Sequence, residues 1–169
     1  AYIESSKPKV VMLMFFTSFI GMLLANPLEL NLEILILGNI GIALMSLSAG
    51  SINQLLDQKI DSIMNRTKSR PLVLGVLSTK NVIIYSFILA SVGFYILYFR
   101  INTLTAWLTL ASLVGYAFIY TLYLKRSTPQ NIVIGGAAGA TPPLLGWTAI
   151  TGQIDYIAVI LFLIIFTWT

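Results

Sequence analysis

Five long runs without a charged side chain constrain what this chain can fold into. They cover residues 10–28, 34–56, 81–99, 101–124 and 127–154. A helix that crosses a bilayer needs about 20 apolar residues at a rise of 1.5 Å per residue, so each run is long enough to span. Only 9% of the 169 residues are charged, against about 25% in soluble domains. The sequence therefore predicts an all-α, multi-pass transmembrane helical bundle with the lipid bilayer as its main solvent.

A sixth apolar run covers residues 156–169, and its 14 residues are too few to cross a bilayer. No internal repeat or low-complexity linker divides the chain. We therefore expect residues 1–169 to form a single transmembrane domain that is truncated at its C-terminus, inside a span.

Lysine and arginine residues lie almost entirely in the loops on one side of the predicted bundle. If the N-terminus is cytosolic, nine of them face the cytosol and Arg100 alone faces the other side. This asymmetry follows the positive-inside rule. We expect the cytoplasmic membrane, with the N-terminus cytosolic, rather than the mitochondrial inner membrane. The same loops explain the net charge of +4, so no nucleic-acid partner is expected. The nine residues are Lys7, Lys9, Lys59, Arg66, Lys68, Arg70, Lys80, Lys125 and Arg126.

The sequence contains neither cysteine nor histidine. This excludes disulfide bonds, thiolate and imidazole metal ligands, and a Ser-His-Asp triad within this stretch. Small residues are frequent instead and are densest at residues 46–51 and 135–140. We expect these two patches to let helices pack closely or to leave room for a bulky ligand. Pro142 and Pro143 should kink or interrupt the fifth span.

Three oxygen-bearing side chains recur at every fourth position near the end of the second run. Asn53, Asp57 and Asp61 therefore share one face of a helix at the membrane boundary. Mg²⁺ prefers one or two carboxylates together with water and phosphate oxygens, and guanidinium groups such as those of Arg66 and Arg70 bind phosphate bidentately. The spacing indicates a Mg²⁺–diphosphate site. The same spacing is equally typical of an ordinary solvated helix end with mixed charges.

The same segment resembles the first aspartate-rich motif of the UbiA-type intramembrane prenyltransferase superfamily. A second segment, residues 120–147, is similar to the branch of that superfamily that farnesylates heme b, and the opening Lys7-Pro8-Lys9 fits this branch as well. The resemblance extends over nearly the whole chain. It rests on Asn53, Asp57, Asp61, Met64, Arg66-Thr67 and Arg70-Pro71-Leu72, and on Lys125-Arg126, Thr128-Pro129, Gln130-Asn131, Gly135-Gly136, Gly139, Pro142-Pro143 and Gly146-Trp147.

The resemblance implies transfer of a farnesyl group from farnesyl diphosphate to a vinyl group of heme b, which gives heme o and releases diphosphate. Heme b is then a substrate, Mg²⁺ is the cofactor, and heme a synthase and oxidase assembly factors are candidate partners. Asn53, Asp57 and Asp61 would be the catalytic residues that hold Mg²⁺ and diphosphate. Basic partners of the phosphates would be Arg66, Arg70, Lys125 and Arg126.

Aromatic side chains are candidates for the wall of the substrate pocket, because apolar and aromatic walls exclude water and accommodate positive charge on a prenyl carbon. Aromatic residues near span ends are also typical interfacial anchors. The candidates are Tyr116, Tyr120, Tyr123 and Trp147.

The sequence departs from the family pattern in three ways. The family fold has about nine helices, of which five to six are expected here, and its second aspartate-rich motif has no counterpart in this chain. The histidines expected after the sixth span are also absent, and Leu55-Leu56 stand where this branch often has a bulky aromatic residue. We therefore expect this stretch alone to be inactive.

Three other functions fit parts of the pattern. A UbiA-type prenyltransferase with another aromatic acceptor would share the diphosphate site, although residues 128–147 favour heme. A membrane transporter would use Asp57 and Asp61 as a cation site, since acidic residues in membranes often mark ion pathways. A purely structural membrane subunit would need neither acid.

Overall fold

Helices make up all of the regular structure in the described part of the chain, which covers residues 1–26, 28, 31–125 and 130–168 of a computed structural model. The single turn α1 (Tyr2–Ser5) precedes α2 (Pro8–Ala25) and the 30-residue α3 (Leu32–Asp61). α4 (Thr79–Ile96) continues into the π-helical η1 (Leu97–Ile101), and α5 (Thr103–Val114) continues into the π-helical η2 (Gly115–Leu124). α7 (Asn131–Thr151) and α8 (Tyr156–Thr167) follow. The all-α prediction is confirmed.

Side-chain caps fix where three of the long helices begin. The Asn31 side chain accepts hydrogen bonds from the backbone N–H groups of Glu33 and Ile34, at 2.9 and 3.3 Å, at the start of α3. Ser78 and Asn102 cap α4 and α5 in the same way. Because these side chains satisfy N–H groups that have no partner inside the helix, each begins at a defined residue.

Four helical segments are long and apolar enough to cross a membrane. They are Pro8–Ala25, Leu32–Asp61, Thr79–Ile101 and Thr103–Leu124, and they correspond to the first four predicted spans. The fifth predicted span becomes α7, which has 21 residues but is rich in glycine, threonine and proline and is not among the four. The shorter α8 is also apolar. Large apolar side chains such as Phe87, Trp107 and Ile164 face outward, as expected of an integral membrane protein.

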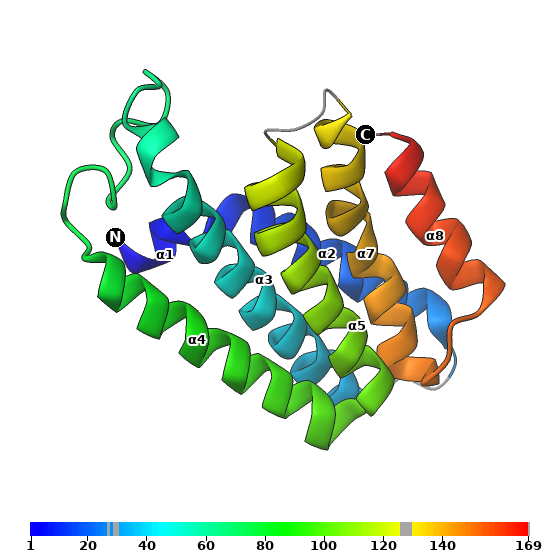
Figure 1. Ribbon diagram of the computed structural model, residues 1–169. Helices are drawn as coiled ribbons and strands as arrows, with labels where there is room; N and C mark the ends of the chain where they lie inside the picture. The colour runs from blue at the N-terminus through cyan, green and yellow to red at the C-terminus, as the bar shows by residue number, and fades with distance from the viewer. Residues whose placement is uncertain (27, 29–30, 126–129, 169) are drawn as a thin grey trace.

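The helices form a bundle in which α3, α5 and α7 lie side by side, with α8 at the edge next to α7 (Figure 1). α2 packs against both α3 and α7. The 30 residues of α3 span about 45 Å at 1.5 Å per residue, so the two ends of this helix lie at opposite ends of the bundle. Glu33 lies at the start of α3, and Asn53, Asp57 and Asp61 lie near its other end.

Glycine lets α2 and α7 touch backbone to backbone. A Cβ atom placed on Gly21 would lie 2.2 Å from the carbonyl oxygen of Pro143, and one placed on Gly146 would lie 2.0 Å from the carbonyl oxygen of Ser18. Neither distance is sterically allowed, so only glycine fits at these two positions. The close packing expected of small residues is thus present, although its tightest points lie outside the two predicted patches.

α7 passes through Pro142 and Pro143 without a break. The prediction that this proline pair interrupts the helix is therefore wrong, and a kink at the pair stays a prediction. Proline has no backbone N–H, so a carbonyl group in the preceding turn of the helix loses its hydrogen bond. In membrane proteins neighbouring helices can satisfy such backbone groups. Here the Pro143 carbonyl lies directly against α2 at Gly21.

Polar contacts join the helices at the end where α3 begins. Arg100, the single basic residue expected on this side, forms an ion pair with Glu33. Asn102 donates a hydrogen bond of 2.9 Å to the carbonyl oxygen of Thr148, which ties the start of α5 to the end of α7. Glu33, Arg100 and Asp155 all belong to this end of the bundle.

Candidate functional site

The three oxygen-bearing side chains of the aspartate-rich motif are buried near the end of α3. Asn53, Asp57 and Asp61 expose only 2%, 3% and 4% of their surface. A solvated helix end would leave such side chains in water, so the interpretation of this motif as ordinary surface charge is wrong. Burial of two carboxylates is costly unless cations or hydrogen-bond donors accompany them.

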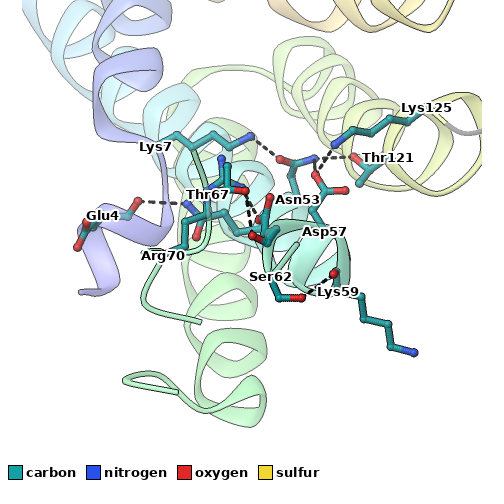
Figure 2. A network of polar contacts seen from close by, with 12 residues as sticks. Glu4, Lys7, Asn53, Asp57, Lys59, Ser62, Thr67, Arg70, Thr121 and Lys125 are labelled. Carbon is teal, nitrogen blue, oxygen red and sulfur yellow. Dashed lines mark hydrogen bonds and ion pairs between the residues drawn. The ribbon is translucent and has the colours of Figure 1, made fainter. Parts of the chain in front are cut away.

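Asn53 and Asp57 form the centre of one network (Figure 2). The Asn53 amide donates to Asp57 Oδ2 at 3.2 Å and to Thr121 Oγ1 at 3.0 Å. Lys125 Nζ, from the residue that follows η2, lies 2.6 Å from Asp57 Oδ2. Lys7 Nζ donates to Asn53 Oδ1. Segments far apart in sequence therefore converge on this face of α3.

Asp61 is held by the loop that follows α3. Its carboxylate forms an ion pair with Arg70, and its backbone carbonyl accepts a hydrogen bond of 3.1 Å from Thr67 Oγ1. Gln58 donates to the carbonyl oxygen of Leu72 at 3.0 Å, which fastens the loop to α3 a second time. Arg66 is exposed in the same loop. A small apolar cluster of Leu72, Leu77 and Val82, with Leu55 packed against it, anchors the loop.

One buried carboxylate oxygen remains without a partner among the described residues. Asp57 Oδ1 has no hydrogen-bond partner, although Asp57 Oδ2 accepts from both Asn53 and Lys125. Leaving such an atom unpaired costs about 1–3 kcal/mol or more when the group is charged. No three Asp, Glu, His or Cys side chains form a metal cage within the described ranges. One or two carboxylates with a free oxygen are what Mg²⁺ uses together with water and phosphate oxygens, so these residues fit that ion.

Lys7 is a charged site residue that sequence reasoning missed, as it also missed Thr121. Lys7 precedes α2 with φ 55° and ψ 60°, a left-handed conformation that is unfavourable for a residue with a Cβ atom. Its ammonium group also lies 3.3 Å from the Tyr116 hydroxyl. Burial, followed by the nearby Arg70 guanidinium, lowers the pKa of Lys7 from 10.5 to about 8. The Lys7-Pro8 pair was the available signal, but nothing in it indicates the contact with Asn53, 46 positions away.

An apolar cavity adjoins this network on the membrane side. It is a partly open pocket between α2, α3, α5, η2 and α7, with an internal volume of about 50 Å³. Lys7 and Tyr116 lie both in the network and in the cavity wall. The remaining lining residues are small or apolar and are Ser6, Val10, Val11, Met14, Met45, Ser46, Ala49, Gly50, Thr109, Ser112, Leu113, Ala138, Thr141, Pro142 and Leu145.

The predicted aromatic wall residues have different surroundings. Tyr116 lines the cavity, and Tyr120 stacks on it with ring centroids 5.5 Å apart. Tyr123 is 69% exposed. Trp147 is buried outside the cavity lining, where its indole N–H donates to Asp155 Oδ2 at 2.9 Å. Of the predicted phosphate ligands, Arg70 and Lys125 join the network, whereas Arg126 lies outside the described residues.

The fold and the spans define an integral membrane helical bundle with a buried polar site at one end. The chain belongs to the UbiA prenyltransferase family, which matches residues 14–169.

Curated relatives are similar over the whole of this chain. It is 55% identical over 168 residues to a protoheme IX farnesyltransferase of Marinobacter nauticus, in an alignment that covers 99% of this chain and 56% of the relative. It is 58% identical over 168 residues to a protein of the same name from Teredinibacter turnerae, with 99% and 54% covered. A protoheme IX farnesyltransferase 1 of Shewanella sp. (strain MR-4) is 56% identical over 169 residues, with 100% and 56% covered. The chain thus spans about half the length of the curated relatives it matches.

Two solved structures share the fold. A UbiA homolog from Archaeoglobus fulgidus bound to DMAPP and Mg²⁺ has a TM-score of 0.82 and 19% sequence identity, with 99% of this chain and 60% of that chain covered. A structure of a UbiA homolog from the same organism, bound to GPP and Mg²⁺, also has a TM-score of 0.82, with 18% identity and the same coverage. The predicted UbiA-type fold is confirmed.

Proposed function

We propose that the protein containing this chain transfers a farnesyl group from farnesyl diphosphate to a vinyl group of heme b, giving heme o and diphosphate. The relatives at 55–58% identity, named protoheme IX farnesyltransferases, support this choice of donor and acceptor. The observation that carries the proposal is the junction of two environments. Buried oxygen ligands and cations lie directly beside an apolar cavity, as a diphosphate with an isoprenoid tail requires.

Asn53, Asp57 and Asp61 are proposed to hold Mg²⁺ and the diphosphate. Their burial and the free Asp57 Oδ1 support this assignment, as does the Mg²⁺ bound to the Archaeoglobus fulgidus homologs. Mg²⁺, when bound, would offset the negative charge that develops on the diphosphate leaving group. In the proposed domain of residues 1–169, the basic groups assigned to the phosphates are Arg66, Arg70, Lys125 and Arg126.

The residues of this chain would serve the reaction in two ways. The allylic C–O bond breaks and its electron pair leaves with the diphosphate, while the vinyl π electrons form the new C–C bond. Water then adds to the cation left on the other vinyl carbon and loses a proton, which gives the hydroxyethylfarnesyl group. Arg70 and Lys125, already beside Asp61 and Asp57, would stabilise the departing charge. The apolar cavity would exclude water from the positively charged prenyl carbon. In the proposed aromatic wall, Tyr116 and Tyr120 are better placed than Tyr123 and Trp147.

The basic end of the bundle is proposed to face the cytosol, in the cytoplasmic membrane, with the N-terminus on that side. Within the described part of the chain, eight lysine and arginine residues belong to this end and Arg100 belongs to the other, which agrees with the positive-inside rule. Diphosphate would then be released into the cytosol. Heme a synthase or oxidase assembly factors are the proposed partners that take up the heme product from the membrane.

Product analysis tests the proposal directly. Membranes containing the full-length protein are incubated with heme b, farnesyl diphosphate and Mg²⁺, and heme o is detected by its mass. Asp57→Ala and Asp61→Ala should each reduce heme o formation by a factor of about 100 or more, because each removes charge stabilisation at the leaving group. Full heme o formation by both variants would rule out the metal site. Farnesylation of another aromatic acceptor, with heme b unchanged, would identify a different member of the family.

A further inference from the structure

We propose that Lys7 is an additional diphosphate-binding residue, whose ammonium group moves from Asn53 to the substrate phosphate at the mouth of the apolar cavity. The inference rests on the proposed function and assigns a role to a residue outside the aspartate-rich motif. Figure 2 shows Lys7 extending toward Asn53 from the segment that precedes α2.

Lys7 occupies the boundary between the polar network and the cavity. It is the single charged residue in the cavity lining among the described residues. On one side its ammonium group contacts Asn53 Oδ1, and on the other it lies 3.3 Å from the Tyr116 hydroxyl and 5.9 Å from the centre of that ring. A prenyl diphosphate has its charged and apolar parts joined at one oxygen. The position of Lys7 matches that junction.

Among the described residues, no carboxylate forms an ion pair with Lys7. Lys125 is paired with Asp57 and Arg70 with Asp61, whereas the partner of Lys7 is the neutral amide of Asn53. In this network, as far as the structure describes it, three cations face two carboxylates, and the surplus positive charge belongs to Lys7. A buried cation is stabilised far better by an anion than by an amide oxygen. Its charge thus favours a phosphate, and the Asn53 oxygen then becomes free for the metal ion.

The backbone holds Lys7 in place at a conformational cost. The residue adopts the left-handed conformation immediately before Pro8, which starts α2. Such strain persists where the surroundings impose it, and it is common at ligand sites. The preceding residue is held against α3: Ser6 Oγ lies 2.8 Å from Ser51 Oγ, and the Ser6 carbonyl oxygen would lie 2.6 Å from a Cβ atom on Gly50. Gly50, in a predicted small-residue patch, thereby brings the α1–α2 junction against α3.

The test measures binding rather than turnover, in the purified full-length protein. Calorimetry gives the affinity for inorganic diphosphate and for farnesyl diphosphate in the presence of Mg²⁺, and electron paramagnetic resonance gives the affinity for Mn²⁺ alone. Lys7→Met should weaken both diphosphate ligands about 10-fold to 100-fold, the range expected for one charged hydrogen bond. Mn²⁺ alone should bind at least as well, because the competing ammonium group is gone. Lys7→Arg should recover part of the diphosphate affinity.

Lys9→Met is the matched control, since Lys9 is exposed in the first turn of α2, and its affinities should equal those of the unmodified protein. Lys7→Gln removes the charge but keeps a donor for Asn53, and it replaces Lys7→Met if that variant does not fold. The inference would be overturned if the uncharged Lys7 variant bound diphosphate with an affinity within twofold of that of the unmodified protein. Asp57→Asn separates the two proposals: retained Mn²⁺ and diphosphate binding in that variant contradicts the proposed function itself, whatever Lys7 does.

Discussion

Lys125 Nζ lies 2.6 Å from Asp57 Oδ2, across 68 positions of sequence. The contact joins the end of η2 to the buried face of α3. Among the residues that the structure describes, it is one of three contacts by which basic side chains from different segments reach the oxygen atoms of the aspartate-rich motif. The site is therefore assembled by tertiary packing and not by α3 alone.

Lys125→Met should destabilise the protein, because Asp57 would remain buried with neither carboxylate oxygen paired to a cation. The Lys125 side chain is 33% exposed, so we expect a loss of about 1–3 kcal/mol, less than for a fully buried pair. Thermal unfolding in detergent measures the loss. Added Mg²⁺ should restore part of it, because a bound cation neutralises the same carboxylate. Lys80→Met, at an exposed lysine, is the control, and an equal effect of both substitutions would contradict the role of the pair.

Gly146→Ala should separate α2 from α7. Its new Cβ atom would lie 2.0 Å from the Ser18 carbonyl oxygen, and backbone cannot move aside as a flexible side chain can. We expect a loss of about 1–3 kcal/mol, typical of overpacking, measured by thermal unfolding. Gly139→Ala is made on the same helix, where a Cβ atom would meet nothing within 4 Å. Equal stability of the two variants would show that the backbone contact is not tight.

Leu72→Ala should release the loop that holds Arg70 against Asp61. Leu72 is 2% exposed in the small cluster that anchors this loop, and removing such a side chain costs about 2–5 kcal/mol of local or global stability. Limited proteolysis with trypsin should then cut faster at the exposed Arg66 and Lys68. Leu74→Ala changes a side chain that is 62% exposed and should leave the cleavage rate unaltered. Unchanged cleavage in the Leu72 variant would mean that other contacts fix the loop.

Single cysteines can test the orientation of the bundle, since this stretch contains none of its own. Lys68 and Gln153 are exposed at opposite ends. In intact cells, a membrane-impermeant maleimide should label Gln153→Cys and should label Lys68→Cys only after the cells are broken open. The reverse pattern would place the basic end outside. The experiment requires a full-length protein from which any other cysteine has been removed.

Much of the fold could be predicted, because a bilayer imposes simple rules on length and polarity. The uncharged runs indicate where α2, α3, α4 and α5 lie. The four-residue spacing of Asn53, Asp57 and Asp61 places them on one helical face, which depends only on helix geometry. The basic character of Lys125 and Arg70 was evident as well, although their partners were not.

The sequence alone could not predict which side chains meet across the bundle. Trp147 was expected in the pocket, but the direction of an aromatic side chain depends on how its helix is rotated, and here the indole meets Asp155. Lys7 was attributed to membrane topology. Its contact with Asn53 could not be foreseen, since it depends on the close packing of Ser6 against Gly50 of α3. These relationships depend on helix rotation and on close backbone approach, neither of which follows from local pattern.

The direct backbone contact of Gly21 with Pro143 and of Gly146 with Ser18 has a consequence for protein engineering. At these two points the helices touch without intervening side chains, so the spacing of α2 and α7 cannot be changed there by trimming side chains. Substitutions that enlarge the cavity without disturbing this contact can be made at Thr109, Ser112 and Tyr116, on α5 and η2. Shortening those side chains enlarges the apolar cavity and leaves the contact between α2 and α7 unchanged.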